Sequence, residues 1–221
     1  MLKGIILDFD GTIVSLHIDF EKIRKKMLMD ALEHHLVFPR KKLPILETLR
    51  YIEIRNGKNR FSEIFLSEAR EFLKKEEIRG ARKSKPLPGS IKLLQELQKM
   101  GIRIGIITRN CRETVEIVTN KFDIPYDILL TRDDIEKVKP DKAHIETAVR
   151  LLGIKKNEVM MVGDHPMDIK CARSCGVRSC GILSGKTGTR NSLRREGADF
   201  VFTSVYDVYR LFHAGRSGQK K

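Results

Sequence analysis

Two carboxylates separated by one residue occur near the start of the chain, where an apolar segment ends. Asp8 and Asp10 lie at the end of segment 3–9 (KGIILDF) and just beyond it, and Gly11 and Thr12 follow. In an extended backbone, residues i and i+2 point to the same side, so both carboxylates would face one cleft. Attack on a phosphate ester requires a nucleophile, a proton donor and positive charge near the phosphoryl oxygens. Asp8 and Asp10 could supply the first two.

Further reactive side chains follow three later segments of strand-like sequence. They are Thr108, Arg109 and Asn110 after residues 102–107, Lys139 after residues 127–131, and Asp164 and Asp168 after residues 158–162. In open α/β sheets, ligands bind beyond the carboxyl ends of the strands. We therefore expect all these side chains at the same edge of the sheet as Asp8.

The residue types at this edge predict a phosphate site with a bound cation. Without a cation, clustered carboxylates would repel each other and an anionic substrate. Asp8 and Asp164 can hold Mg²⁺, which prefers oxygen ligands and bridges to substrate phosphate. Lys139 would bind the phosphoryl group by charge and Thr108 by a hydroxyl hydrogen bond. Gly11 would let backbone amides approach it closely.

The elements between these residues are expected to alternate between strand and helix. Segment 3–9 has the composition of a strand buried on both faces. Further strands are expected at 102–107, 127–131, 158–162, 178–183 and 199–202, and helices at 89–100, 112–122, 141–152 and 167–175. This alternation predicts an α/β fold with a parallel sheet flanked by helices.

A stretch of helical periodicity separates the first strand from the others. It runs from about residue 20 to residue 79, and breaks at Pro39, Asn56-Gly57 and Gly80 predict three helices. The simplest domain organisation is a discontinuous core with a helical cap inserted after the first strand. The expected bounds are 1–15 and 86–215 for the core, 16–85 for the cap and 216–221 for a flexible basic tail.

Four of these motifs together resemble those of the haloacid dehalogenase superfamily. They are DFDGT at 8–12, the strand-terminal Thr108, Lys139-Pro140 and GDHPMD at 163–168, and they occur in that family's order. The resemblance covers nearly the whole chain. It implies a Rossmann-like core with a mobile α-helical cap, as in the branch of the family that contains phosphoglycolate phosphatases.

The resemblance also implies a role for each motif residue. Asp8 would form a covalent aspartyl-phosphate, and Asp10 would act as general acid and base. Mg²⁺ would be held by Asp8, Asp164 and the backbone carbonyl of Asp10, with Asp168 in support through water or Lys139. The expected phosphate-binding residues are Gly11, Thr12, Thr108, Arg109, Asn110 and Lys139. Family members that cleave carbon–halogen bonds lack an acid at the position of Asp10, so a phosphatase is favoured.

The expected reaction is hydrolysis of a small phosphorylated metabolite, and phosphoglycolate is the leading substrate by resemblance alone. A phosphomutase acting on a sugar phosphate would use the same two aspartates and remains an alternative. In the cap, Arg55, Lys58 and Arg60 lie in a turn between two helices. This turn could clamp a distal carboxylate of the substrate, or it could be a solvated basic loop.

The composition limits the class of partner. The net charge of +14 creates a positive potential that would gather anions, including nucleic acid. Only 6% of the 221 residues are aromatic, and no nucleic-acid motif is present, so nucleic acid is the minor alternative. No secretory signal precedes Asp8, and no window approaches ~20 apolar residues. We expect a cytoplasmic protein without membrane segments, as a monomer or homodimer.

The cysteines and histidines show no spacing that predicts a site. The four cysteines are expected to be reduced thiols, although Cys171, Cys175 and Cys180 also allow a less favoured zinc site. The histidines His17, His34, His35 and His144 have no partner pattern. Solvated or helix-packing roles are therefore expected for them.

Overall fold

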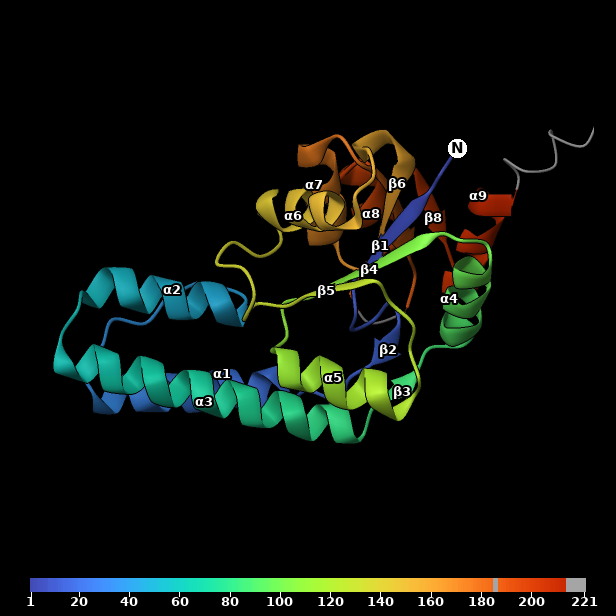
Figure 1. Ribbon diagram of the computed structural model, residues 1–221. Coiled ribbons are helices and arrows are strands. Elements are labelled where there is room, and N and C mark those ends of the chain that lie inside the picture. Colours follow the sequence, from blue (N-terminus) through green and yellow to red (C-terminus); the bar gives the residue numbers. More distant parts are fainter. Residues whose placement is uncertain (185–186, 214–221) are drawn as a thin grey trace, which may run out of the picture. The chain divides into compact units, whose positions relative to one another are not determined.

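The computed structural model describes residues 1–184 and 187–213, and the predicted tail at 216–221 lies outside these residues. The chain divides into two compact units (Figure 1). The core unit contains Met1–Leu16 and the chain from Ala81 onward. The cap unit is His17–Gly80. Each unit has its own packed interior.

The core unit is built on a six-stranded sheet with the order β5-β4-β1-β6-β7-β8. All five strand pairs are parallel. The strands are β1 (Gly4–Leu7), β4 (Arg103–Ile107), β5 (Ile128–Leu130), β6 (Val159–Gly163), β7 (Arg178–Ile182) and β8 (Phe200–Phe202). The predicted α/β fold with a Rossmann-like parallel sheet is thus confirmed.

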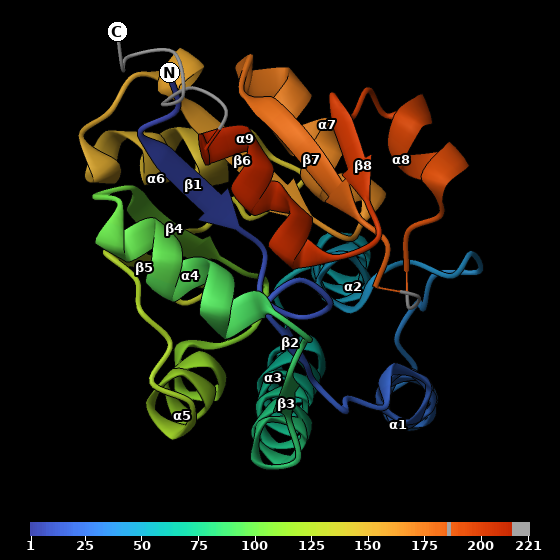
Figure 2. The ribbon, with the colours of Figure 1, turned by 90° about the vertical axis from the view of Figure 1, so that its right-hand side faces the viewer.

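Helices cover both faces of the sheet, with α6 and α7 on one face and α4 and α9 on the other (Figure 2). The helices of the core unit are α4 (Ser90–Lys99), α5 (Arg112–Lys121), α6 (Ala143–Leu152), α7 (Pro166–Cys175), α8 (Arg190–Arg195) and α9 (Tyr209–His213). Short 3₁₀ helices occur at Lys156–Glu158 and Val205–Val208. Ile6 and Met161 of the sheet pack with Ile145 and Ala172 of α6 and α7. Because both faces are covered, all four residues of β1 are buried.

A two-stranded antiparallel ribbon marks where the chain leaves and re-enters the core unit. It pairs β2 (Val14–Ser15) with β3 (Lys85–Pro86). The sequence predicts a cap of residues 16–85, whereas Leu16 and residues 81–85 group with the core unit. Backbone pairing explains the difference, because Lys85 pairs with Ser15 and the N–H of Leu16 donates to Asp10.

The cap unit contains the three helices α1 (Phe20–Glu33), α2 (Ile45–Asn56) and α3 (Arg60–Arg82) (Figure 1). Their apolar faces share one cluster that includes Ile23, Met27, Leu49, Ile52, Phe65 and Leu73. Gly80 was expected to end a helix but lies inside α3. A Cβ at Gly80 would lie 3.2 Å from the backbone oxygen of His17. Glycine therefore occurs here because another chain segment passes close to the helix.

Two further expectations concern helices and thiols. None of the helices within residues 1–184 and 187–213 is both long and apolar enough to cross a bilayer. The cysteines Cys111, Cys171, Cys175 and Cys180 are buried, and no disulfide joins them within the described residues. Buried cysteine packs as a small apolar side chain. Two of them, Cys171 and Cys175, belong to the cluster between the sheet and α6 and α7.

Candidate active site

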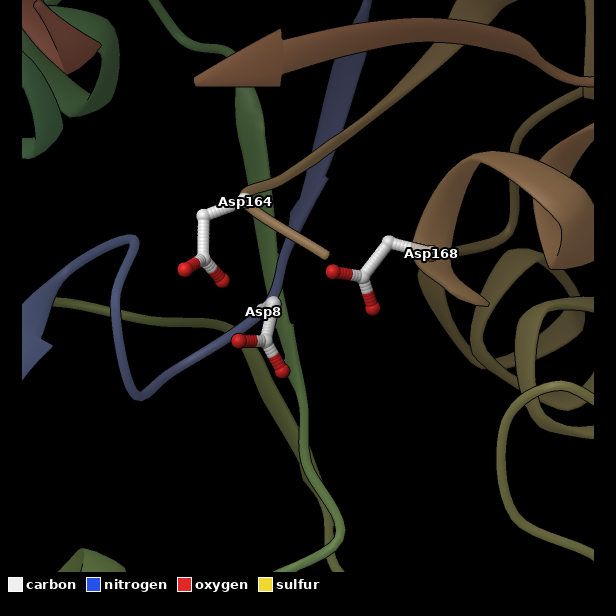
Figure 3. A group of neighbouring side chains, drawn as sticks. All are labelled: Asp8, Asp164 and Asp168. Atoms are coloured by element: carbon white, nitrogen blue, oxygen red, sulfur yellow. The ribbon is translucent and has the colours of Figure 1, made fainter. Parts of the chain in front are cut away.

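The candidate site lies at the carboxyl ends of the central strands. Asp8 follows β1, Thr108 follows β4 and Asp164 follows β6. Since β1 pairs with both β4 and β6, these three residues end adjacent strands. Asp168 comes from the first turn of α7. Figure 3 shows the side chains of Asp8, Asp164 and Asp168 close to one another.

Three carboxylates and one lysine form the centre of the site. Oxygen atoms of Asp8, Asp164 and Asp168 lie within 4.8 Å of one another. The Nζ of Lys139 is 2.5 Å from Oδ1 of Asp8 and 2.7 Å from Oδ1 of Asp168. The Lys139 side chain is only 1% exposed. A buried ammonium group needs such partners, because an unpaired charge in the interior costs several kcal/mol.

The pKa values in this cluster reflect an excess of negative charge. Burial, together with the charges of Asp168 and Asp164, outweighs Lys139 and raises the pKa of Asp8 to about 8. Burial also raises the pKa of Asp164. Burial opposes the charged form of Lys139, but Asp168 and Asp8 outweigh that effect and raise its pKa. The three carboxylates carry more charge than the one ammonium group can balance, so a further positive charge would reduce their mutual repulsion.

This arrangement fits a divalent cation with a preference for oxygen. Clustered carboxylate oxygens are typical ligands of Mg²⁺, which also keeps several waters. Asp8 and Asp164 would hold the ion directly. Asp168 is already paired with Lys139, and its Oδ2 accepts the backbone N–H of His165 at 3.1 Å. Asp168 therefore fits a supporting position.

The turn after β1 fixes Asp10 and places Gly11 next to Asp164. Oδ1 of Asp10 accepts the N–H of Leu16 at 2.7 Å. Gly11 has a φ of +85°, and a Cβ there would overlap the Asp164 carboxylate. The amide of Gly11 donates to the carbonyl of Val14 at 2.7 Å. Glycine is therefore required here because a larger residue would clash with the Asp164 carboxylate. The N–H of Gly11 donates within the turn itself.

Thr12 and the residues after β4 are mostly buried. The Thr12 hydroxyl is fully buried and has no hydrogen-bond partner among the described residues. The Thr108 hydroxyl donates to Oδ1 of Asn110 at 2.9 Å and accepts the N–H of Asn110 at 3.2 Å. Arg109 donates to the backbone carbonyl of Lys139 at 3.1 Å. Asn110 thus orients Thr108, and Arg109 holds the segment that carries the lysine.

Two hydroxyl groups of the site were not anticipated. Ser184 donates to Oδ2 of Asp164 at 2.9 Å, and the Thr187 hydroxyl contacts the same oxygen. Both lie just after β7, which pairs with β6. Ligands bind beyond the carboxyl ends of the strands in such sheets, and this rule, which predicted Asp164, could also have predicted these two residues because they follow the neighbouring strand.

Comparison with known proteins agrees with this geometry. Residues 5–182 match the family model of the haloacid dehalogenase-like hydrolases, so the chain belongs to that family. Over 117 residues it is 35% identical to the pyrophosphatase PpaX of Bacillus cereus (strain AH820). This match covers 52% of the chain and 54% of that protein, so the chain spans about half the length of the curated relatives it matches.

Solved structures share the fold over most of the chain. A hydrolase from Pseudomonas syringae has a TM-score of 0.71 and 23% identity, with 96% of this chain and 98% of that chain covered. A protein described as a predicted phosphoglycolate phosphatase from Haemophilus somnus 129PT has a TM-score of 0.69 and 16% identity, with the same coverage. At these identities the likeness concerns the fold.

Proposed function

We propose that the protein is a magnesium-dependent phosphatase that hydrolyses a small phosphomonoester through an aspartyl-phosphate on Asp8. The main support is the contact of one buried ammonium group, that of Lys139, with Asp8 and Asp168. A buried lysine beside clustered carboxylates at the edge of a parallel sheet can bind a phosphoryl group next to a carboxylate nucleophile. Family membership and the name of the Bacillus relative support the same class of reaction.

The proposed chemistry gives one role to each of the two aspartates. The Asp8 carboxylate attacks phosphorus, the bond from phosphorus to the ester oxygen breaks, and Asp10 gives the leaving oxygen its proton. Asp10 then removes a proton from water, which attacks the aspartyl-phosphate and releases inorganic phosphate. The hydrogen bond from Leu16 to Oδ1 of Asp10 fixes the orientation of the acid. Lys139 and Thr108 would contact the phosphoryl oxygens.

The cation has a limited and defined part in this proposal. Asp8, Asp164 and the backbone carbonyl of Asp10 would hold it. When bound, it would supply positive charge against the phosphoryl oxygens and lower the pKa of Asp8. Asp8 would then be ionised at neutral pH, as a nucleophile must be.

The deciding experiment is a panel of phosphate compounds assayed for released phosphate. Phosphoglycolate, pyrophosphate and hexose phosphates are incubated with the protein in Mg²⁺ and in EDTA. We expect hydrolysis in Mg²⁺, loss of hydrolysis in EDTA, and a fall of at least about 10⁴-fold in kcat for Asp8→Asn. Turnover that survives Asp8→Asn would rule out the proposed nucleophile. Conversion of a hexose phosphate into an isomer, with little free phosphate, would indicate the phosphomutase alternative.

Substrate choice is proposed to come from the cap, at the turn between α2 and α3. Of the three cations expected in one turn, only Lys58 lies between the helices, because Arg55 is in the last turn of α2 and Arg60 is the first residue of α3. The Arg55 guanidinium lies 5.8 Å from the ring centre of Tyr51. Replacement of all three cations by alanine should raise KM for carboxylated substrates and leave KM for other esters unchanged. An equal change for all substrates would mean that the turn is only a solvated basic loop.

A further inference from the structure

His144 is a buried histidine whose two ring nitrogens both have backbone partners. It lies in the first turn of α6 and is 0% exposed. Its Nδ1 accepts the backbone N–H of Lys139 at 3.1 Å. Its Nε2 is 3.2 Å from the backbone carbonyl of Leu130, the last residue of β5. The side chain therefore bridges two segments that are separate in sequence.

The partners define the protonation state of the ring. The N–H of Lys139 can donate only to an unprotonated Nδ1, so Nε2 carries the hydrogen and donates to Leu130. Burial, with a smaller effect from the charge of Lys139, lowers the pKa of His144 to about 3. The imidazole is therefore neutral at physiological pH and keeps both hydrogen bonds.

The bridge connects Thr108 and Lys139, two of the residues expected to bind the phosphoryl group. The carbonyl of Leu130 also accepts the N–H of Thr108, at 2.9 Å. One carbonyl oxygen is thus shared by Thr108 and His144, and His144 in turn holds the amide of Lys139. On its other side, the Lys139 carbonyl accepts a hydrogen bond from Arg109. The backbone of Lys139 is fixed at both its N–H and its C=O.

We propose that His144 is a positioning residue that sets the place of the Lys139 ammonium group relative to Thr108 and Asp8. This inference rests on the proposed function, in which Lys139 binds the phosphoryl group. The lysine has four rotatable side-chain bonds, so its Nζ keeps one position against both carboxylates more closely when its backbone starts from a fixed point. His144 supplies that fixed point through the Lys139 amide. A displacement of about 1 Å at a reacting centre can cost about 100-fold in rate.

Two substitutions separate this role from simple packing. His144→Leu fills much of the space but removes both hydrogen bonds. His144→Asn keeps an acceptor for the Lys139 amide, because the asparagine Oδ1 can occupy nearly the same position as Nδ1 of the histidine. It loses the hydrogen bond to the carbonyl of Leu130. Val149→Ala is the matched control. Val149 lies on the same helix, is buried, and belongs to the apolar cluster between the sheet and helices α6 and α7.

The kinetic result expected is a graded loss of kcat/KM. His144→Leu should lower kcat/KM about 10- to 100-fold. His144→Asn should lower it only about 3-fold, as expected for one lost neutral hydrogen bond. Val149→Ala should lower the melting temperature without changing kcat/KM. The proposal is wrong if the leucine variant keeps wild-type kcat/KM, or if the asparagine and leucine variants lose the same amount.

Two measurements do not depend on turnover, and the first of them uses the wild-type protein alone. In the ¹⁵N-labelled wild-type protein, a scalar coupling between the Lys139 amide nitrogen and Nδ1 of His144 is expected across their hydrogen bond. Absence of that coupling would overturn the proposal. Calorimetric titration with inorganic phosphate in Mg²⁺ should show affinity lowered at least about 10-fold by His144→Leu and less than about 3-fold by His144→Asn.

The outcomes for His144 and for the proposed function are distinguishable. A wild-type protein that hydrolyses no phosphate compound in the panel would contradict the proposed function. In that case the phosphate affinities still decide whether His144 positions Lys139 as an anion-binding group. Active wild-type protein with equal phosphate affinity in all three His144 forms would contradict the role of His144 alone.

Discussion

The buried charge cluster of the core unit and the exposed ion pairs of the cap unit place charged side chains in opposite surroundings. In the core, Lys139 and Asp168 pair with side chains that are 1% and 3% exposed. In the cap, the pair of Lys42 and Glu21 has both side chains 69% exposed. Other cap pairs, such as Lys75 with Glu71, are similarly open to solvent. The same chemical groups therefore experience very different surroundings in the two units.

This contrast indicates which charges carry the function. An exposed ion pair contributes about 0–1 kcal/mol, because water and salt screen it. A buried cluster is costly to desolvate and is weak support for stability. A buried cluster of this kind in the core is therefore better explained by a catalytic or binding role than by stability. Perturbed pKa values of clustered carboxylates are also a sign of a functional site. The exposed ion pairs of the cap, such as Lys42 with Glu21, fit a role in solvation.

Among the lysines of these ion pairs, the largest effect is expected from Lys139→Met, which breaks the buried cluster. Asp8 and Asp168 would lose their shared cation, which should lower the free energy of unfolding by about 3 kcal/mol or more. Phosphatase kcat should fall about 10³-fold, as for loss of a main group that stabilises charge in the transition state. Urea unfolding and steady-state kinetics measure the two effects. Wild-type turnover in this variant would contradict the role of Lys139.

A second effect concerns pH and Mg²⁺. The pKa of Asp8 is raised from 3.8 to about 8 in the folded protein, so folding retains a proton that the unfolded chain releases. Through this group, stability without metal should fall as pH rises from about 4 to about 8. Mg²⁺ at 100 times its Kd should add about 2.7 kcal/mol, with a larger gain at pH 8 than at pH 5.

Thermal unfolding in EDTA and in Mg²⁺ across this pH range tests the second prediction. The variant Asp164→Asn serves as the comparison, because it should lose most of the gain from Mg²⁺. A gain of equal size at every pH, or one that survives in the variant, would show that the cation binds outside this cluster.

Gly11→Ala should have a smaller effect on stability but a selective one on the cation. At a φ of +85° an alanine costs about 2 kcal/mol, and its Cβ would displace the Asp164 carboxylate. The gain in stability from Mg²⁺ should therefore be lost. Gly57→Ala in the cap is the control, since Gly57 has a φ of +67° but nothing within 4 Å of an added Cβ. That variant should be strained yet keep its response to Mg²⁺.

The smallest effect is expected from Lys26→Met in the cap. Lys26 pairs with Asp30 one helical turn away, and its side chain is 52% exposed. Such pairs contribute about 0.3–0.5 kcal/mol, and less in high salt. Urea unfolding at low and high salt should show this small difference, and kcat should stay within about 2-fold of wild type. A loss comparable to that of Lys139→Met would remove the distinction between the two units.

Much of the core could be predicted because its signals are local and strong. Apolar runs such as residues 159–163 identify buried strands, and the edge rule places Asp8 and Asp164 together. The helices α8 and α9 were missed. Helix α8 has six residues, RNSLRR, with Leu193 as its buried residue, so it carries no readable periodicity. The catalytic and binding roles of the site residues stay predictions.

The contacts of His144 and Gly80 show what the sequence could not provide. His144 is five residues from Lys139, and only the folded turn between them brings its ring to the Lys139 amide. Gly80 resembles a helix breaker in the sequence, but it lies inside a helix where the backbone of His17 leaves little space for a side chain. In both cases the residue type is explained by a tertiary contact, and propensity is a weak guide to such contacts.

The central place of β1 has a consequence for synthesis of the protein. β1 leaves the ribosome before the cap, whereas its neighbours β4 and β6 are made only after the whole cap. Until then the nascent chain carries an apolar strand with two unsatisfied edges, which favours aggregation and slow closure of long-range pairs. Translation that stops before β6 would leave a fragment with one open edge of β1. Such fragments are expected to depend on chaperones for their solubility.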